Sequence, residues 1–291
     1  MVFKFLSKPN AKIEIVSQNK VLPGTLLPVE IRLTAQEDIK AREVRVELVG
    51  EETYYIKETH RDSKGHTSTQ VVRKTDTIAR IAKTVAEQPT FGNGSMQRWE
   101  VSLQLPSNAP PTCRTKLINI QWKLKAVLDV PKQPDQSQEM PLYVLCPCPQ
   151  ADTATMPLGE KIFNDVAVNV VVPQVASPGE TLVGRLTLKI KDKLNVQGIR
   201  AELVQIEDAG ARQADEVIVK TDISGAIEFN QGEDRSFDFY LNIPAEAAPT
   251  AVSQHSNLRW KVKTVIARRM KTDFNVEQEV FVCNAAPEPK K

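Results

Sequence analysis

The chain has few of the residues that build most catalytic and metal sites. Its 291 residues include three histidines and four cysteines. Cys146 and Cys148 form a close pair, but no second Cys or His pair stands near them to complete a tetrahedral zinc site. We therefore expect no bound metal. We also expect the thiols to be reduced and incidental, as they are in a reducing compartment.

Signatures of catalysis and cofactor binding are missing as well. There is no Gly-x-x-x-x-Gly-Lys loop, no Gly-x-Ser-x-Gly elbow and no His-Glu-x-x-His pair. The Gly92–Gly94 segment lacks the third glycine and the helix of a dinucleotide site, and it is typical of a tight turn. His60, His66 and His255 lie in predicted loops, and general-base catalysis would need one of them held against a nucleophile and an orienting acid. We expect a protein that is not an enzyme, with no catalytic residue and no cofactor.

Neither charge nor hydropathy indicates a polyanion partner or a membrane span. The 38 Lys and Arg against 36 Asp and Glu give a formal net charge of +2, spread along the chain, so nucleic acid is not an expected partner. The longest nearly apolar run, Val166–Val172, is far shorter than the roughly 18 residues that a spanning helix requires. The first residues, Met1–Pro9, lack the apolar core of a secretory signal. The expected location is cytoplasmic.

An internal repeat dominates the sequence. Ala11–Val49 aligns without a gap on Val166–Val204 at a constant shift of 155, and Gly94–Val144 aligns on Gly232–Val282 at a shift of 138. The difference, 155 − 138 = 17, means that the first copy has 17 additional residues between Val49 and Gly94. The polar segment around His60–Gln70 is the expected insertion and is typical of a long hairpin loop.

The repeat and a Pro-containing stretch between the copies predict the domain limits. They are an N-terminal domain at residues 1–148, a linker at 149–161, a C-terminal domain at 162–285 and a short polar tail at 286–291.

Alternation of apolar and polar residues recurs in both copies. It is clear in Glu43–Leu48 and in Ile118–Lys125, and Leu258–Lys263 keeps the same phase in the second copy. Trp122 and Trp260 are therefore expected to be equivalent core residues. Helical spacing is not evident, and half-buried antiparallel strands pack as face-to-face sheets. The predicted fold class is all-β, with two tandem antiparallel β-sandwich domains of immunoglobulin-like type.

Turns and alternating strands follow one another in a fixed order in both copies. The motifs are Pro23-Gly24, Val44–Gly50, Trp99–Leu105, Ala109–Thr112, Ile118–Asp129 and, in the second copy, Ser177–Gly184. In the first copy this pattern resembles that of arrestin N-domains, and the second copy resembles the bacterial sporulation-control branch of the same superfamily. Together the copies cover nearly the whole chain. The resemblance implies two arrestin-like sandwiches that act as a cytoplasmic scaffold or adaptor. Residues 285–291 are too short for an arrestin regulatory tail and the chain has no Pro-Pro-x-Tyr motif, so receptor desensitisation and ubiquitin-ligase recruitment are not implied.

A basic stripe is the candidate binding site. Basic residues alternate along one predicted strand of the second copy and continue into the following turn, and Lys123 and Lys125 stand at the equivalent strand of the first copy. Spaced about 7 Å apart along a strand, such residues can bind phosphates; a solvated face that discourages edge pairing is the alternative interpretation. The candidate residues are Arg259, Lys261, Lys263, Arg268, Arg269 and Lys271.

Two functions remain open at this point. The first is a non-catalytic adaptor that binds a protein partner at sandwich edges, on a concave face or at the interdomain crease, with a homodimer through an edge strand as one form of such pairing. The second is a peripheral membrane protein whose basic stripe and turn bind anionic lipid.

Overall fold

A computed structural model describes residues 8–149, 156–157 and 161–285 of the chain. These residues form strands and loops, and no helix among them has the length and apolarity needed to cross a bilayer. They divide into two compact units. Residues 150–155 and 158–160 of the expected linker, and the tail at 286–291, lie outside the described residues. The domain limits at 148 and 162 therefore stay predictions.

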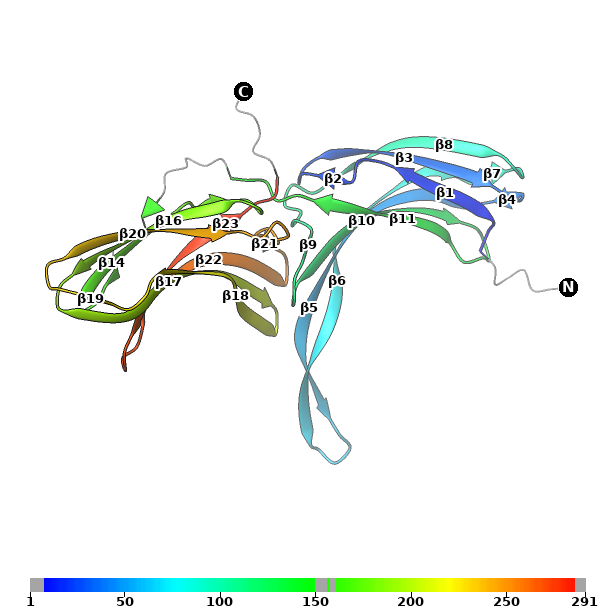
Figure 1. The fold of residues 1–291 in the computed structure, drawn as a ribbon. Helices are drawn as coiled ribbons and strands as arrows, with labels where there is room; N and C mark the ends of the chain where they lie inside the picture. The colour runs from blue at the N-terminus through cyan, green and yellow to red at the C-terminus, as the bar shows by residue number, and fades with distance from the viewer. Residues whose placement is uncertain (1–7, 150–155, 158–160, 286–291) are drawn as a thin grey trace, which may run out of the picture. The chain divides into compact units, whose positions relative to one another are not determined.

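The first sandwich has a small sheet of order β1-β3-β8 and a larger sheet of order β2-β11-β10-β5-β6, with β9 beside β10 and a separate β4-β7 pair (Figure 1). Its strands are β1 (Ala11–Val16), β2 (Lys20–Val21), β3 (Leu26–Ala35), β4 (Ile39–Lys40), β5 (Glu43–Arg61), β6 (Thr67–Glu87), β7 (Thr90–Phe91), β8 (Met96–Gln104), β9 (Cys113–Arg114), β10 (Asn119–Asp129) and β11 (Gln136–Val144).

The second sandwich repeats this arrangement with the orders β12-β14-β16-β20 and β15-β23-β22-β17-β18; β13, β19 and β21 pair with β14, β17 and β22. Its strands are β12 (Met156–Pro157), β13 (Lys161–Ile162), β14 (Val166–Val172), β15 (Val175–Ala176), β16 (Thr181–Ile190), β17 (Leu194–Ala209), β18 (Arg212–Ser224), β19 (Ile227–Phe229), β20 (Asp234–Asn242), β21 (Ala251–Val252), β22 (Ser256–Arg268) and β23 (Phe274–Val282).

The strand registers confirm the duplication. In the first copy Val29 pairs with Val101, and in the second Gly184 pairs with Phe239. The shifts are 184 − 29 = 155 and 239 − 101 = 138, the same two values that relate the copies in sequence. The tandem β-sandwich fold predicted from the sequence is confirmed.

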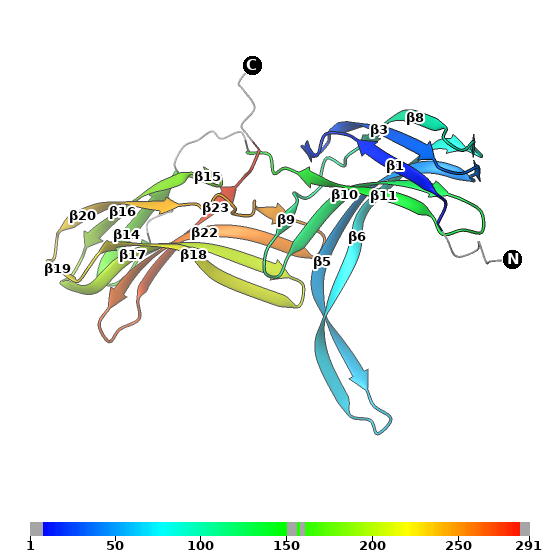
Figure 2. The same cartoon turned by 45° about the vertical axis from the view of Figure 1, so that its right-hand side comes forward.

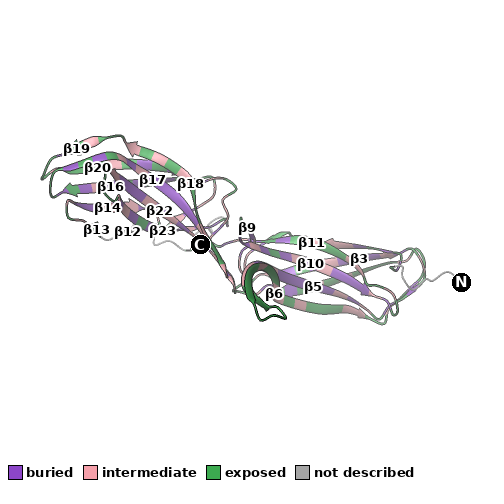
Figure 3. Ribbon diagram, turned by 90° about the horizontal axis from the view of Figure 1, so that it is seen from below, coloured by how far each residue is buried: buried purple, intermediate pink, exposed green. Residues whose placement is uncertain are grey.

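Equivalent tryptophans lie in the two cores, as the alternation predicted. Trp122 on β10 and Trp260 on β22 are both buried. The indole N–H of Trp122 donates to the carbonyl of Pro110 at 2.9 Å, and that of Trp260 donates to the carbonyl of Ala248 at 3.0 Å. Each buried ring thus satisfies its only polar group. Figure 3 shows the resulting alternation of buried and exposed residues along the strands.

The 17 additional residues form a two-stranded arm, which we define as Tyr55–Arg73. In the second copy β17 ends at Ala209, equivalent to residue 54 (209 − 155), and β18 begins at Arg212, equivalent to residue 74 (212 − 138). Residues 55–73, nineteen in number, thus replace the two residues 210–211, and 19 − 2 = 17. Strand β10 pairs with β5 only as far as Thr53, and Figures 1 and 2 show the arm extending beyond that sheet.

The arm corrects the expectation of a long loop around His60–Gln70. The strands continue to Arg61 and resume at Thr67, so only Asp62–His66 forms the turn. Both faces of this ribbon are largely exposed. A strand without a buried face needs no apolar alternation, so its sequence looks like that of a loop.

The expectation that all thiols are reduced is wrong for two cysteines. Cys148 and Cys283 form a disulfide with a Cα–Cα distance of 5.1 Å. They are brought together because the chain near Cys146 runs beside the residues that follow β23: Cys146 N–H donates to Asn284 Oδ1 at 2.7 Å, and Ala285 N–H donates to the Cys146 carbonyl at 3.0 Å. Cys146 itself is free and buried, and burial raises the pKa of its thiol to about 11.

Candidate functional site

The basic stripe of the second sandwich lies on β22, which is hydrogen-bonded on one side to β17 and on the other to β23. Arg259 Nη1 lies 3.6 Å from Glu279, and Lys261 Nζ lies 3.2 Å from Glu277 and 3.6 Å from Asp215. Lys263 follows on the same face and is half-buried. Two of the three cations thus already have carboxylate partners.

A groove of about 490 Å³ surrounds the stripe. Five carboxylates line it beside only two cations, which gives the groove a formal charge of 2 − 5 = −3. An anion would have to displace these carboxylates or lie among them, so the local electrostatics favour a cationic ligand. The residues that line the groove are Ile206, Glu207, Asp208, Gln213, Asp215, Arg259, Lys261, Glu277 and Glu279.

The other three predicted cations lie at the turn after β22, where one is partly buried and bonded and two are exposed. The guanidinium of Arg268 stacks on Phe274 at 3.6 Å from the ring centroid, pairs with Asp165 at 3.4 Å and donates to the Thr272 carbonyl. Its side chain is only 13% exposed, so it holds the turn together. Arg269 and Lys271 are exposed and flank Met270, which is 96% exposed. Among the six candidate residues, Arg269 and Lys271 are the two that are exposed.

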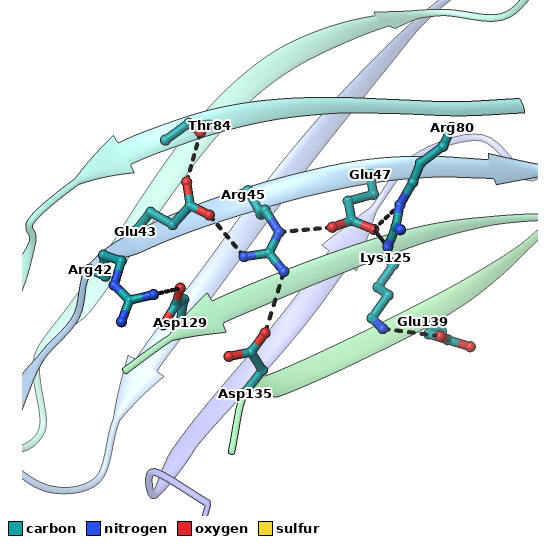
Figure 4. A network of polar contacts seen from close by, with 10 residues as sticks. All are labelled: Arg42, Glu43, Arg45, Glu47, Arg80, Thr84, Lys125, Asp129, Asp135 and Glu139. Atoms are coloured by element: carbon teal, nitrogen blue, oxygen red, sulfur yellow. Dashed lines mark hydrogen bonds and ion pairs between the residues drawn. The ribbon is translucent and has the colours of Figure 1, made fainter. Parts of the chain in front are cut away.

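The first sandwich has a network of ion pairs on the equivalent sheet face (Figure 4). Arg45 is its centre: its guanidinium donates to Glu43 and Glu47 at 2.8 Å each and to Asp135 at 3.3 Å. Arg80 on β6 donates to the other oxygen of Glu47 at 2.8 Å. At the predicted stripe position of this copy, Lys125 Nζ lies 3.9 Å and Lys123 Nζ 3.3 Å from Glu139.

Charge pairing inside this network outweighs burial. Burial alone would raise the pKa of the Glu47 carboxyl, but the hydrogen bonds from Arg45 and Arg80 lower it below its ordinary value. Burial likewise opposes the charge of Arg45, and the bonds to Glu47 and Glu43 raise its pKa. These groups stay ionised and hold one another, which orders the surface of the sheet.

The second sandwich has a smaller version of this ion-pair network. Arg200 donates to Glu202 at 2.6 Å, and these residues are equivalent to Arg45 and Glu47 (45 + 155 = 200; 47 + 155 = 202). On β18 the residue opposite Glu202 is Lys220, whose Nζ lies 3.8 Å from Asp222. In the part of the chain that the structure describes, no cluster of three or more His, Cys, Asp or Glu is arranged to hold a metal.

The arm contributes functional candidates that sequence reasoning missed. Thr59 and Thr69 contact each other through their hydroxyl groups at 3.2 Å, which places the odd-numbered side chains of both strands on one face. His60 contacts Gln70 at 3.1 Å on the opposite face, and His66 bonds Asp62 within the turn at 3.0 Å. Lys57 and Arg61 share the face of Thr59. The spacing of Lys57, Thr59 and Arg61 could have indicated this face, had the segment been recognised as a strand.

Comparison with known families gives a match to the first copy. Residues 11–149 match the family model of the arrestin (or S-antigen) C-terminal domain. The match confirms the resemblance to the arrestin-like superfamily. The similarity of the second copy to the sporulation-control branch stays a prediction. No curated protein matches the chain.

Proposed function

We propose that this arrestin-like protein is a non-catalytic adaptor or scaffold that binds a protein partner in the cytoplasm, in regulation or trafficking. Arrestin-family domains are generally non-enzymatic. The observation that carries the proposal is the open edge of the larger sheet in the first sandwich. Strand β6 ends the order β2-β11-β10-β5-β6, so its outer side has no strand partner over 21 residues within the described chain.

Backbone geometry shows which groups of this edge are available. Asp62 N–H donates to the carbonyl of His66 across the turn at 2.9 Å. Hydrogen-bonded and non-hydrogen-bonded pairs alternate in an antiparallel ribbon, so the even-numbered residues of the hairpin pair inward. The hydroxyls of Thr53 and Thr75 contact each other at 3.3 Å in the same register, so the odd-numbered residues of β6 as far as Thr75 turn their N–H and C=O groups outward. Such a row of donors and acceptors is a template for an added strand.

The equivalent edge of the second sandwich is shorter and partly engaged. Strand β18 has 13 residues, and the hydroxyl of Thr221 donates to the Tyr240 carbonyl on β20 at 2.8 Å. The first sandwich therefore offers the longer edge for a partner.

Affinity capture with an edge-blocked variant tests the proposal. The immobilised full chain should recover a stoichiometric protein partner from native cytosol, and Thr75→Pro should lose it, because proline removes an outward N–H that makes no bond inside the hairpin. Thr187→Ser, at an exposed site of the second sandwich, is the control and should retain the partner. Recovery of no partner by the folded wild type, or equal recovery by Thr75→Pro, argues against the proposal.

The membrane alternative rests on the exposed tip Arg269–Lys271, in which Met270 stands between two cations. Each basic residue contributes about 1 kcal/mol near an anionic bilayer. Sedimentation with phosphatidylserine vesicles forms the second arm of the same experiment. Salt-sensitive binding to these vesicles, without a protein partner, would replace the adaptor proposal.

A further inference from the structure

The arm has a net positive charge, whereas the rest of the chain is balanced. It contains four cations against Glu58 and Asp62, a formal net charge of 4 − 2 = +2, which equals the net charge of the whole chain. The rest of the sequence is therefore balanced. The four cations are Lys57, Arg61, Lys64 and Arg73.

The charge is not spread evenly over the arm. The Thr59–Thr69 contact places Lys57, Arg61 and Arg73 on one face. Glu58 lies on the opposite face, where its carboxylate is 3.7 Å from His60. Asp62 is occupied in the turn, where it accepts from the N–H groups of Lys64 and His66. The odd-numbered face thus presents cations and threonines without a carboxylate.

The same face adjoins an unpaired strand edge. Beyond Thr53, β5 leaves β10, and from Ile56 to Arg61 its outer side has no backbone partner in the described residues. The odd-numbered residues Lys57, Thr59 and Arg61 turn their N–H and C=O groups to this edge. On the arm's other edge, along β6, only Arg73 provides a cation. The cations and the unpaired backbone N–H and C=O groups of the arm therefore lie along the same strand, β5.

We propose that an acidic, extended segment of a partner protein adds as a strand to the β5 edge of the arm. This inference rests on the proposed adaptor function. Carboxylates four residues apart in the segment would lie beside Lys57 and Arg61, where opposite charges on neighbouring strands attract. A peptide satisfies both the N–H and the C=O groups of the edge. A phosphodiester chain offers only acceptors, so it would leave the carbonyls unpaired.

A labelled peptide tests the charge requirement. The probe is a fluorescein-labelled nonapeptide that alternates glutamate with valine, and its control has lysine in place of glutamate. Anisotropy with the full chain should show binding of the glutamate peptide alone. Lys57→Gln with Arg61→Gln should weaken it roughly tenfold, since two cross-strand charge pairs are lost. Arg269→Gln with Lys271→Gln makes the same change in net charge outside the arm and should change binding less than about twofold.

Two threonine variants test the edge. Thr59→Pro removes an outward N–H of β5 and should abolish binding, whereas Thr69→Pro removes an outward N–H of β6 and should leave binding intact. The reverse result overturns the assignment to β5. Equal binding of both peptides, or an unchanged affinity in the Lys57→Gln, Arg61→Gln variant, overturns the proposal. Tighter binding of a 12-base-pair DNA duplex or of phosphatidylserine vesicles at these same lysine and arginine residues also overturns it.

A shortened chain separates this inference from the proposed function. Replacing residues 55–73 by the Gly-Ala dipeptide of the second copy removes the arm and leaves the β6 edge beyond residue 73. It should abolish peptide binding and weaken capture of the partner, whose other contact is that β6 edge. If the shortened chain captures the partner as well as the wild type does, the adaptor function stands and the arm proposal fails. If the wild type captures no partner, the adaptor function itself fails.

Discussion

The two sandwiches share their strand order and register, yet they fill equivalent positions with different side chains. Where the first pairs Val29 with Val101, the second pairs Gly184 with Phe239. A Cβ at Gly184 would lie 2.2 Å from the Phe239 ring, so the large ring requires the glycine opposite it. At this pair the two copies share the backbone register, while the side chains differ.

The two copies differ more at their surfaces than in their cores. The first has the arm and the ion-pair network around Arg45, whereas the second has the short turn at 210–211 and the acidic groove. The disulfide is also specific to the second sandwich, because the position equivalent to Cys283 in the first is Leu145 (283 − 138 = 145). The two copies therefore agree in strand order and register and differ in their exposed features.

Removal of the disulfide should have the largest effect on stability. Cys148 and Cys283 are 135 residues apart in sequence, so the bond restricts the unfolded chain strongly. We expect Cys148→Ser to lower the free energy of unfolding by about 4 kcal/mol. Urea titrations of the wild type and of Cys148→Ser, each with and without a reducing agent, measure this loss. The reducing agent should lower the unfolding midpoint of the wild type and leave that of Cys148→Ser unchanged. Equal midpoints in all four titrations would contradict the disulfide.

Exchanging the core pairs tests whether volume is conserved between the copies. Gly184→Val should destabilise the protein by about 3 kcal/mol, because the new side chain overlaps the ring of Phe239. Adding Phe239→Val recreates the pair of the first sandwich and should restore most of the loss. A double-mutant cycle by chemical denaturation measures the coupling. Additive losses in the double variant would show that the two positions do not compensate each other.

Much of the fold could be predicted from the sequence, because it depends on patterns that the sequence displays directly. The two ungapped shifts gave the register, and alternation placed Trp122 and Trp260 in the cores. The strands of the arm could not be predicted, since they bury neither face and therefore show no apolar period. The disulfide could not be predicted either, because its cysteines meet only after the chain has folded.

The candidate site was harder to predict for a related reason. Sequence alternation placed Arg259 and Lys261 on one face correctly, but their partners Glu277 and Glu279 come from the neighbouring strand β23. A row of cations therefore looks free in the sequence and is neutralised in the fold. Arg268 differs again, because its contact with Phe274 across the turn depends on the turn's conformation.

Loss of the Glu47 carboxylate should lower the stability less than the two changes above. Comparison with the loss of Glu202 distinguishes the ion-pair networks of the two sandwiches. Glu47 pairs with both Arg45 and Arg80, whereas Glu202 pairs with Arg200 alone in the part of the chain that the structure describes. We expect Glu47→Gln to cost about 2 kcal/mol and Glu202→Gln about 1 kcal/mol, measured by urea denaturation at pH 7. Equal losses would show that Arg80 adds nothing to the network.

The pH dependence of this loss follows from the sign of the pKa shift. The folded-state pKa of Glu47 lies below its ordinary value of 4.5. The unfolded state therefore binds the proton more readily, so the carboxylate's contribution is complete above pH 4.5 and is lost as the pH falls through the folded-state pKa. Between about pH 5 and pH 3 the wild type should lose more stability than Glu47→Gln, and their difference should shrink. A difference that stays constant over this range would mean that the variant acts through packing and not through the charge of Glu47.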